Sequence, residues 1–214
     1  DSPKIFSIER RLKRLAKNQK TEVDFESLVT HDVSNTVAEL SGQTNCDWLV
    51  LGWDGRAHSG LLVRNPVGWL LTHINSNFAL FKDNGIKNIG KVVLALRPGR
   101  KDRNFLKVAE RICKSYRASL TLLHIVTPDF AKSKALKMEK KSASLLSELK
   151  IKTHLQILES ENPIESVSEV SSEHDLLILG APEQNSWINV LFGSGRDKFT
   201  ESAACSVLRL TIKN

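Results

Sequence analysis

The sequence predicts an α/β fold of doubly wound parallel sheets, arranged as two related units of which the first is truncated. Short apolar runs that end at turn residues alternate with longer helical patterns, as in βαβ units. One run occurs twice: Asp47–Gly52 returns as Asp175–Gly180, and each copy is an aspartate, four apolar residues and a glycine. Because strands covered on both faces are continuous apolar runs, both copies are predicted to be buried parallel strands.

The repeat extends beyond this strand. At the same spacing of 128 residues, Thr72 matches Thr200, and the match continues without a gap over 47–82 and 175–210. A register held over this length indicates two related domains.

The division into domains follows from the repeat. We predict a partial unit at 1–85 and a complete unit at 86–214, with the turn signal Asp83-Asn84-Gly85 at their boundary. The first unit has no counterpart of the strand, helix and strand that open the second. Its strands therefore need a neighbour from the second unit or from another chain, since an unpaired edge promotes aggregation.

The elements of the first unit follow from periodicity and capping signals. Pro3 lies near the start of an amphipathic helix, Asp32 or Ser34 can cap a second helix, and the break at Gly42–Asn45 ends it. In chain order the predicted elements are helix 3–18, strand 23–29, a helix through Val37 and Leu40, strand 47–52, a helix near 66–74 and strand 78–81.

The second unit alternates five strands with four helices. Arg97-Pro98-Gly99 stops the first strand, Pro128 opens the second helix, and Pro163 lies in the first turn of the third. The predicted elements are strand 91–96, helix 103–117, strand 120–126, helix 128–149, strand 153–158, helix 163–173, strand 175–180, helix 194–203 and strand 207–212. Right-handed crossovers between the strands give a doubly wound parallel sheet.

Positive charge is concentrated at the start of the chain. Residues 1–20 hold seven basic and two acidic residues, whereas the whole chain has a formal net charge of +7. Such a patch favours anionic lipid headgroups or nucleic acid. It also fits a solvated helix face, because Ile5, Ile8, Leu12 and Leu15 form an apolar helical stripe.

The residues that carry catalytic or metal chemistry are scattered. Cys46, Cys113 and Cys205 show no C-x-x-C spacing and the six histidines form no metal-binding pattern, so we expect reduced cysteines, a cytoplasmic protein, no metal site and no cofactor. Neither a Walker loop nor a nucleophile elbow is present in the sequence. Basic residues are not interleaved with aromatic ones as in nucleic-acid-binding modules. The sequence therefore predicts neither an enzyme nor a nucleic-acid partner.

Three stretches of the second unit resemble the universal stress protein family. Leu120–Val126 is similar to the family's second strand. Asp175–Gly180 followed by Gly193-Ser194 resembles its fourth strand and phosphate loop. Ala204–Leu208 resembles the entry to its last strand, with serine where proline is usual. The resemblance covers the second unit well and the first more weakly.

The resemblance implies a nucleotide site that is not intact here. Nucleotide-binding members carry Gly-x2-Gly-x9-Gly-[Ser/Thr] after the fourth strand, and its backbone amides hold phosphates. In this chain Gly180, Gly193, Ser194 and Gly195 fit that position, but Glu183 stands where the second glycine belongs. A carboxylate at that point repels phosphate.

The first copy and the end of the first strand depart from the pattern as well. Gly52 and Gly55 are present, but Asn65-Pro66 replaces the Gly-Ser pair, and proline supplies no amide donor. The family usually places an aspartate after its first strand, where this chain has Arg97 and Gly99. We therefore expect degenerate sites that hold at most a weakly bound nucleotide or anion, and strand-end turns require such glycines even without a ligand.

Paired degenerate units behind a basic segment resemble the cytosolic C-terminal region of prokaryotic transporters in the amino acid permease and cation-chloride cotransporter superfamily. The resemblance implies a non-catalytic regulatory and dimerisation domain at the cytoplasmic face of the membrane. Its partners would be a second copy and the membrane-embedded transporter domain of the same chain. Trp53 and Trp187, in loops after the repeated strand, are interface candidates, although either ring can fold back on its own unit. The alternative is a stand-alone sensor of ATP, AMP or a cyclic dinucleotide.

Overall fold

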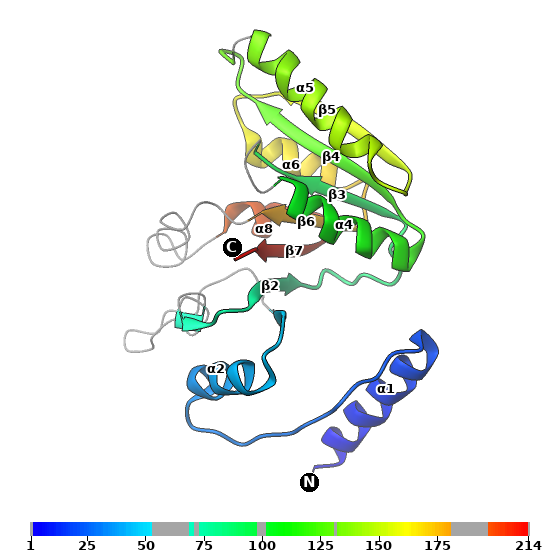
Figure 1. Cartoon of the computed structure of the whole chain (residues 1–214), viewed down its shortest axis with the longest axis vertical. Helices are drawn as coiled ribbons and strands as arrows, with labels where there is room; N and C mark the ends of the chain where they lie inside the picture. The colour runs from blue at the N-terminus through cyan, green and yellow to red at the C-terminus, as the bar shows by residue number, and fades with distance from the viewer. Residues whose placement is uncertain are drawn as a thin grey trace.

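One continuous sheet of seven strands organises the computed structural model, which describes residues 2–52, 69–70, 73–97, 102–130, 132–180 and 197–213 (Figure 1). The strands are β1 Trp48–Gly52, β2 Asn77–Lys82, β3 Lys91–Ala95, β4 Ser119–Val126, β5 Thr153–Glu159, β6 Leu176–Gly180 and β7 Ser206–Thr211. Their order across the sheet is β1-β2-β7-β6-β3-β4-β5, and neighbours are parallel except β2 and β7, which are antiparallel. The predicted α/β fold is confirmed, with an antiparallel joint that the sequence did not predict.

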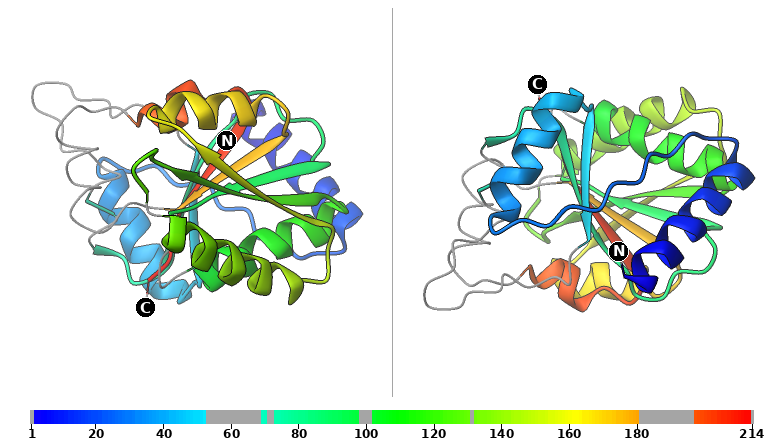
Figure 2. Two further views of the ribbon diagram at one scale, coloured as in Figure 1. Left: turned by 90° about the horizontal axis from the view of Figure 1, so that it is seen from above. Right: turned by 90° about the horizontal axis from the view of Figure 1, so that it is seen from below.

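Helices cover both faces of the sheet. α4 (Asp102–Tyr116) and α5 (Lys132–Ser147) lie on one face, and α6 (Pro163–Ser171) and α8 (Lys198–Ser202) lie on the other (Figure 2). Successive side chains along each strand point to opposite faces of the sheet, so they pack into two separate cores. The core beneath α4 includes Val92, Leu94, Leu120, Leu122 and Ile178, and the core beneath α6 includes Val93, Leu123, Leu177, Leu179 and Val207. Because both faces are buried, these strands need the unbroken apolar runs seen in the sequence.

The described part of the first 85 residues adds the helices α1 and α2 and the strands β1 and β2. α1 spans Pro3–Gln19 and α2 spans Val33–Thr44. Asp32 caps α2, because its side chain accepts a hydrogen bond from the backbone N–H of Asn35 at 3.0 Å. The small core of this part consists of Leu70, Ile74, Phe78 and Leu80, with Val37, Ala38, Leu49, Leu51 and Trp69 packed against it.

Side chains reinforce the joint between β2 and β7. The side-chain amide of Asn84 donates to the carbonyl oxygens of Ala203 and Cys205, at 3.2 and 2.8 Å, and its backbone N–H donates to Ser206 Oγ at 2.9 Å. The hydroxyl of Ser206 donates in turn to Asp83 Oδ1 at 3.3 Å. The turn at residues 83–85 thus ties the end of β2 to the start of β7.

Two predicted elements are corrected. Residues 23–29 form no strand, since this segment has no neighbouring strand to share hydrogen bonds with and its Val29 is 101% exposed. α5 begins at Lys132 rather than at Pro128, which lies in a turn. The predicted helices near 66–74 and 194–203 lie partly outside the described residues.

Two burial predictions, for α1 and β1, are corrected as well. Ile8 and Leu15 of the predicted apolar stripe are 45% and 49% exposed, and Ala16 alone is buried among the residues of α1. Val50 in β1 is 57% exposed, because it points to the face of the strand opposite to Leu49 and Leu51, which pack against the small core. Both elements therefore present apolar side chains to solvent.

Candidate functional site

The carboxyl ends of β3 and β6 lie next to each other, because Ala95 pairs with Leu179 in their parallel register. Ligands of open α/β sheets bind at such strand ends. Two predicted site residues, Arg97 and Gly180, come to this edge, whereas Gly52 lies at the end of the edge strand β1. The other predicted site and interface residues lie outside the described part of the chain: Gly55, Gly99, Gly193, Ser194, Gly195, Trp53 and Trp187.

Apolar side chains fill the space beside Gly180. A Cβ atom on this glycine would lie 3.1 Å from Leu96 Cδ2 and 3.3 Å from Phe105 Cζ. Leu96 is 9% exposed and Phe105 is 8% exposed. The predicted nucleotide site would lie at the carboxyl ends of β3 and β6. In the described part of the chain, the space beside Gly180 at these strand ends is therefore filled by apolar side chains rather than hollow.

His124 on β4 is buried close to the same strand ends, where it contacts Leu96. Its Nδ1–H donates to the carbonyl oxygen of Leu96, and its Nε2 accepts from Ser142 Oγ, both at 2.8 Å. Burial lowers the pKa of His124, which keeps the ring neutral. Lys141 and Asp102 form an ion pair nearby, at 2.8 Å. These polar groups satisfy one another, which favours a structural role for them.

A buried ion pair braces the end of β6. Arg209 Nε on β7 lies 2.8 Å from Asp197 Oδ2, and Arg209 Nη1 donates to the carbonyl oxygen of Gly180 at 3.4 Å. Asp197 also accepts hydrogen bonds from the hydroxyl of Thr200 at 2.8 Å and from its backbone N–H at 3.4 Å. Burial lowers the pKa of Arg209, and the neighbouring carboxylate opposes this shift. No motif in the sequence indicates the pair, since its partners meet through the fold of the last helix and strand.

The two copies of the repeated strand have different surroundings. β6 lies between β7 and β3, whereas β1 has β2 as its neighbour on one side and no described strand on the other. A Cβ atom on Gly52 would meet no atom within 4 Å among the described residues, in contrast to the crowded Gly180. Among the described residues, β1 is therefore an edge strand whose outer side pairs with no other strand.

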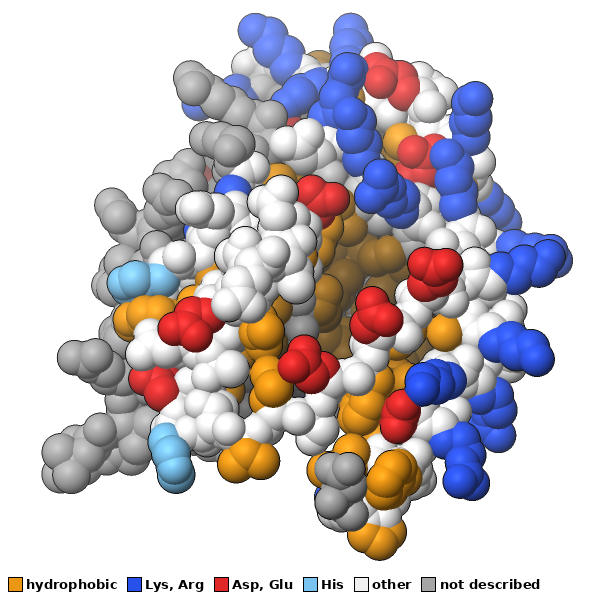
Figure 3. Space-filling model, turned by 60° about the horizontal axis from the view of Figure 1, so that its bottom comes forward, with side chains coloured by type: hydrophobic (Ala, Val, Ile, Leu, Met, Phe, Trp, Pro, Cys, Tyr) orange, Lys and Arg blue, Asp and Glu red, His pale blue; other side chains and the backbone are white. Residues whose placement is uncertain are grey.

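Exposed apolar side chains gather in the first fifty residues. Of the ten large hydrophobic side chains that are exposed in the described ranges, eight lie in this part. They are Phe6, Ile8, Leu15, Val23, Leu28, Val29, Val33 and Val50. Figure 3 shows hydrophobic side chains around a hollow in this side of the molecule. A hollow bordered by exposed hydrophobic side chains is a candidate interaction surface.

A small thiol and hydroxyl cluster joins α2 to β2. Cys46 Sγ lies 3.4 Å from Ser41 Oγ and 3.3 Å from Ser76 Oγ, and the two hydroxyls are 3.0 Å apart. Hydrogen bonds from Ser41 and Ser76 lower the pKa of Cys46. Burial raises the pKa of both Cys113 and Cys205 to about 11. All three cysteines are free, so Cys46 is the thiol best placed to react.

The described ranges hold neither a cluster of metal ligands nor a helix suited to cross a membrane. Among those residues, no group of three or more His, Cys, Asp or Glu side chains is placed to hold a metal ion. The same residues include no helix that is long and apolar enough to cross a membrane.

Comparison with known proteins identifies the architecture. No protein-family model and no curated protein sequence matches the chain. Among solved structures, a universal stress protein from Archaeoglobus fulgidus DSM 4304 matches with a TM-score of 0.65 and 15% identity, over 95% of this chain and 75% of that one. The chain has a universal stress protein fold. The resemblance found in the sequence is thus confirmed at the level of fold.

Other solved universal stress proteins show the same likeness. A putative universal stress protein from Pseudomonas aeruginosa UCBPP-PA14 matches with a TM-score of 0.61 and 11% identity, over 94% of this chain and 77% of that one. A universal stress protein solved in complex with cAMP matches with a TM-score of 0.49 and 15% identity, over 59% of this chain and 100% of that one. Identities this low establish the fold, and the activity has to be argued from the residues.

Proposed function

We propose that this chain is a non-catalytic regulatory and dimerisation domain of a membrane secondary transporter. The observation that carries the dimerisation part is the open edge at β1, where Val50 is 57% exposed and a neighbouring strand is lacking on one side among the described residues. An edge strand of this kind is a template for pairing with another chain. A second copy can supply the same edge in antiparallel orientation, which gives a closed two-fold dimer.

The joint between β2 and β7 supports the interpretation of 1–85 and 86–214 as tandem units. Phe78 pairs with Thr211 across this joint. At the spacing of 128 residues, their counterparts are Ser206 and Asp83, and these two residues are joined by a hydrogen bond of 3.3 Å. The strand pairing itself is symmetric, since Ala79 pairs with Leu210 and their counterparts Val207 and Lys82 pair with each other. This is expected when two related units meet about a local two-fold axis.

The apolar packing beside Gly180 supports a non-catalytic scaffold, meaning a domain that holds proteins together. It disfavours the alternative, a sensor of ATP, AMP or a cyclic dinucleotide. Leu96 and Phe105 occupy the space next to the strand end, where a ligand would need access to the backbone. Calorimetry with each of these nucleotides tests the choice, and we expect no saturable heat at millimolar nucleotide. Saturable binding that Gly180→Val abolishes would replace the scaffold by the sensor.

Light scattering coupled to gel filtration tests the dimer. We expect the unmodified chain to elute as a dimer and Val50→Arg to elute as a monomer, because a charge in the middle of β1 opposes strand pairing. Leu136→Arg is the matched control, since Leu136 on α5 is 58% exposed but lies away from the edge. Circular dichroism confirms that both variants are folded. A monomeric unmodified chain, or a dimer that Val50→Arg leaves intact, refutes dimerisation through β1.

The transporter assignment rests on the resemblance of paired degenerate units behind a basic segment. In this proposal, the chain lies at the cytoplasmic face of the membrane, next to the transporter domain of the same polypeptide. The gene tests this part: we expect hydrophobic spans of roughly 20 residues in the same reading frame. A complete frame without such spans would leave the dimerising scaffold but remove the transporter.

A further inference from the structure

α1 presents a cationic surface to solvent. Its basic residues are all exposed and comprise Lys4, Arg10, Arg11, Lys13, Arg14 and Lys17, with Lys20 at the C-cap. Glu9 is the acidic residue of the helix, and its carboxylate is engaged by Lys13 at 2.6 Å. The outward side of α1 is therefore strongly positive.

The same helix exposes apolar side chains beside these cations. Phe6 is 53% exposed, and Ile8 and Leu15 are exposed as described above. Phe6 also lines an open pocket of about 430 Å³ with Pro3, Ser7 and Arg10. A helix whose cations are accompanied by exposed apolar side chains is suited to the boundary between lipid headgroups and acyl chains.

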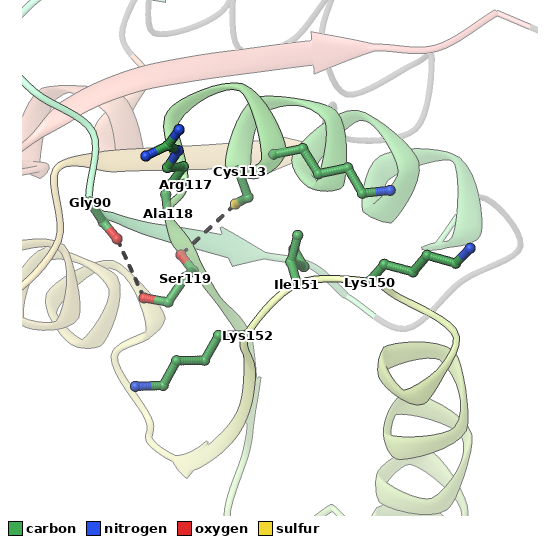
Figure 4. A pocket seen from close by; sticks show the side chains of 9 residues that line it. Gly90, Cys113, Arg117, Ala118, Ser119, Lys150, Ile151 and Lys152 are labelled. Carbon is green, nitrogen blue, oxygen red and sulfur yellow. Dashed lines mark hydrogen bonds between the residues drawn. The ribbon is translucent and has the colours of Figure 1, made fainter.

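A second basic cluster lies at the amino ends of β3, β4 and β5. Lys114, Arg117, Lys150 and Lys152 line a pocket of about 490 Å³ together with Gly90. Figure 4 shows the side chains of Arg117, Lys150 and Lys152 around this opening. Glu110 pairs with Lys114 at 2.8 Å, so the other three cations dominate the charge of the cluster.

α1 and this cluster share one end of the molecule. The carboxyl end of α1 lies at the end where β3 and β4 begin and where α4 finishes, and the views of Figures 1 and 2 agree on this. Lys and Arg side chains also gather along the upper and right-hand margin of the face in Figure 3. The positive surface is thus formed by the first helix and by residues from the middle of the sequence.

We propose that α1, with the basic cluster of Arg117, Lys150 and Lys152, binds the surface of a membrane that contains anionic phospholipids. Charge complementarity selects this occupant, since a second copy would bring the same cationic surface of α1 against this one and would be repelled there. Nucleic acid would match the cations but would leave Ile8 and Leu15 in water. The proposal holds whether or not the chain is attached to a transporter.

Vesicle sedimentation tests the proposal. The full chain is mixed with vesicles of phosphatidylcholine alone and with vesicles of equal parts phosphatidylcholine and phosphatidylserine. We expect it to sediment with the anionic vesicles alone and to be released by added salt. Arg10→Gln with Arg14→Gln should weaken binding at least about tenfold, because each cation near an anionic surface contributes to affinity. Lys132→Gln with Lys137→Gln on α5 is the control of equal charge change and should bind like the unmodified chain.

A second pair of variants separates a membrane from nucleic acid. Ile8→Ser with Leu15→Ser keeps every charge and, since both side chains are exposed, leaves the core intact. It should weaken vesicle binding several-fold while the circular dichroism spectrum stays unchanged. Undiminished vesicle binding by this variant, tighter binding to duplex DNA than to vesicles, or equal loss in the α5 control overturns the proposal. These outcomes leave the dimer test at Val50 unaffected, so the two ideas fail separately.

Discussion

Arg209 Nε lies 2.8 Å from Asp197 Oδ2, and the two side chains are only 6% and 2% exposed. Asp197→Ala is expected to lower the free energy of unfolding by about 3–5 kcal/mol, because it leaves the guanidinium charge buried without its carboxylate. Urea denaturation measures the loss. Glu148→Ala is the control, since it breaks the exposed pair with Arg103 at 2.9 Å and should cost about 0–1 kcal/mol. Equal losses in the two variants would contradict the importance of the buried pair.

Gly180 and Gly52 allow a matched comparison of the two copies of the strand. Gly180→Ala is expected to destabilise the fold by about 1–3 kcal/mol relative to Gly52→Ala, because its Cβ must displace Leu96 and Phe105. At Gly52 the added methyl group meets no described atom, so the lower entropy of the unfolded chain should make the change neutral or slightly stabilising. Thermal unfolding of both variants shows which of the two is less stable. The reverse order would show that the space beside Gly180 is not tightly packed.

His124 is expected to make the protein sensitive to mild acid. Burial lowers its pKa from the ordinary value of 6.5, so below that pH the unfolded chain binds a proton that the folded chain does not. The free energy of unfolding should therefore fall as the pH drops below about 6.5. His124→Gln should flatten this dependence, whereas the same change at the exposed His154 should not. Urea titrations at a series of pH values provide the measurement, and identical slopes for both variants would refute the role of His124.

Cys46 is expected to be the fast-reacting thiol of the native protein. It is partly exposed and its pKa is lowered by hydrogen bonds from Ser41 and Ser76, while the buried Cys113 and Cys205 have pKa values of about 11. A disulfide reagent at mildly alkaline pH should label one thiol per chain rapidly and all three after unfolding. Cys46→Ser should remove the fast phase, and a fast phase that survives it would contradict the assignment.

The fold of residues 86–214 was largely readable from the sequence because most of its strands are covered on both faces. A run such as Leu176–Leu179 then has to be apolar at every position, and helices on both sides follow from the alternation of elements. The run at Trp48–Leu51 is just as apolar, yet it forms an edge strand. An apolar run indicates that a strand can be buried. Which strands and helices cover it depends on strand pairing between residues that are far apart in the sequence.

The candidate site was predictable from the sequence only in part. Arg97 and Gly180 follow neighbouring strand ends, so topology alone places them at one edge. The packing of Leu96 and Phe105 against that glycine depends on how α4 lies on the sheet, which no local pattern encodes. The antiparallel joint was equally hidden, since it pairs residues as far apart in the sequence as Phe78 and Thr211.

The joint between β2 and β7 has a consequence for assembly. Both strands belong to one polypeptide, so bringing them together requires closure of the intervening chain and no encounter between molecules. Dilution therefore cannot separate the two halves of the sheet. A response of this protein to its own concentration therefore has to act on contacts between separate chains, such as the proposed pairing at the outer margin of β1.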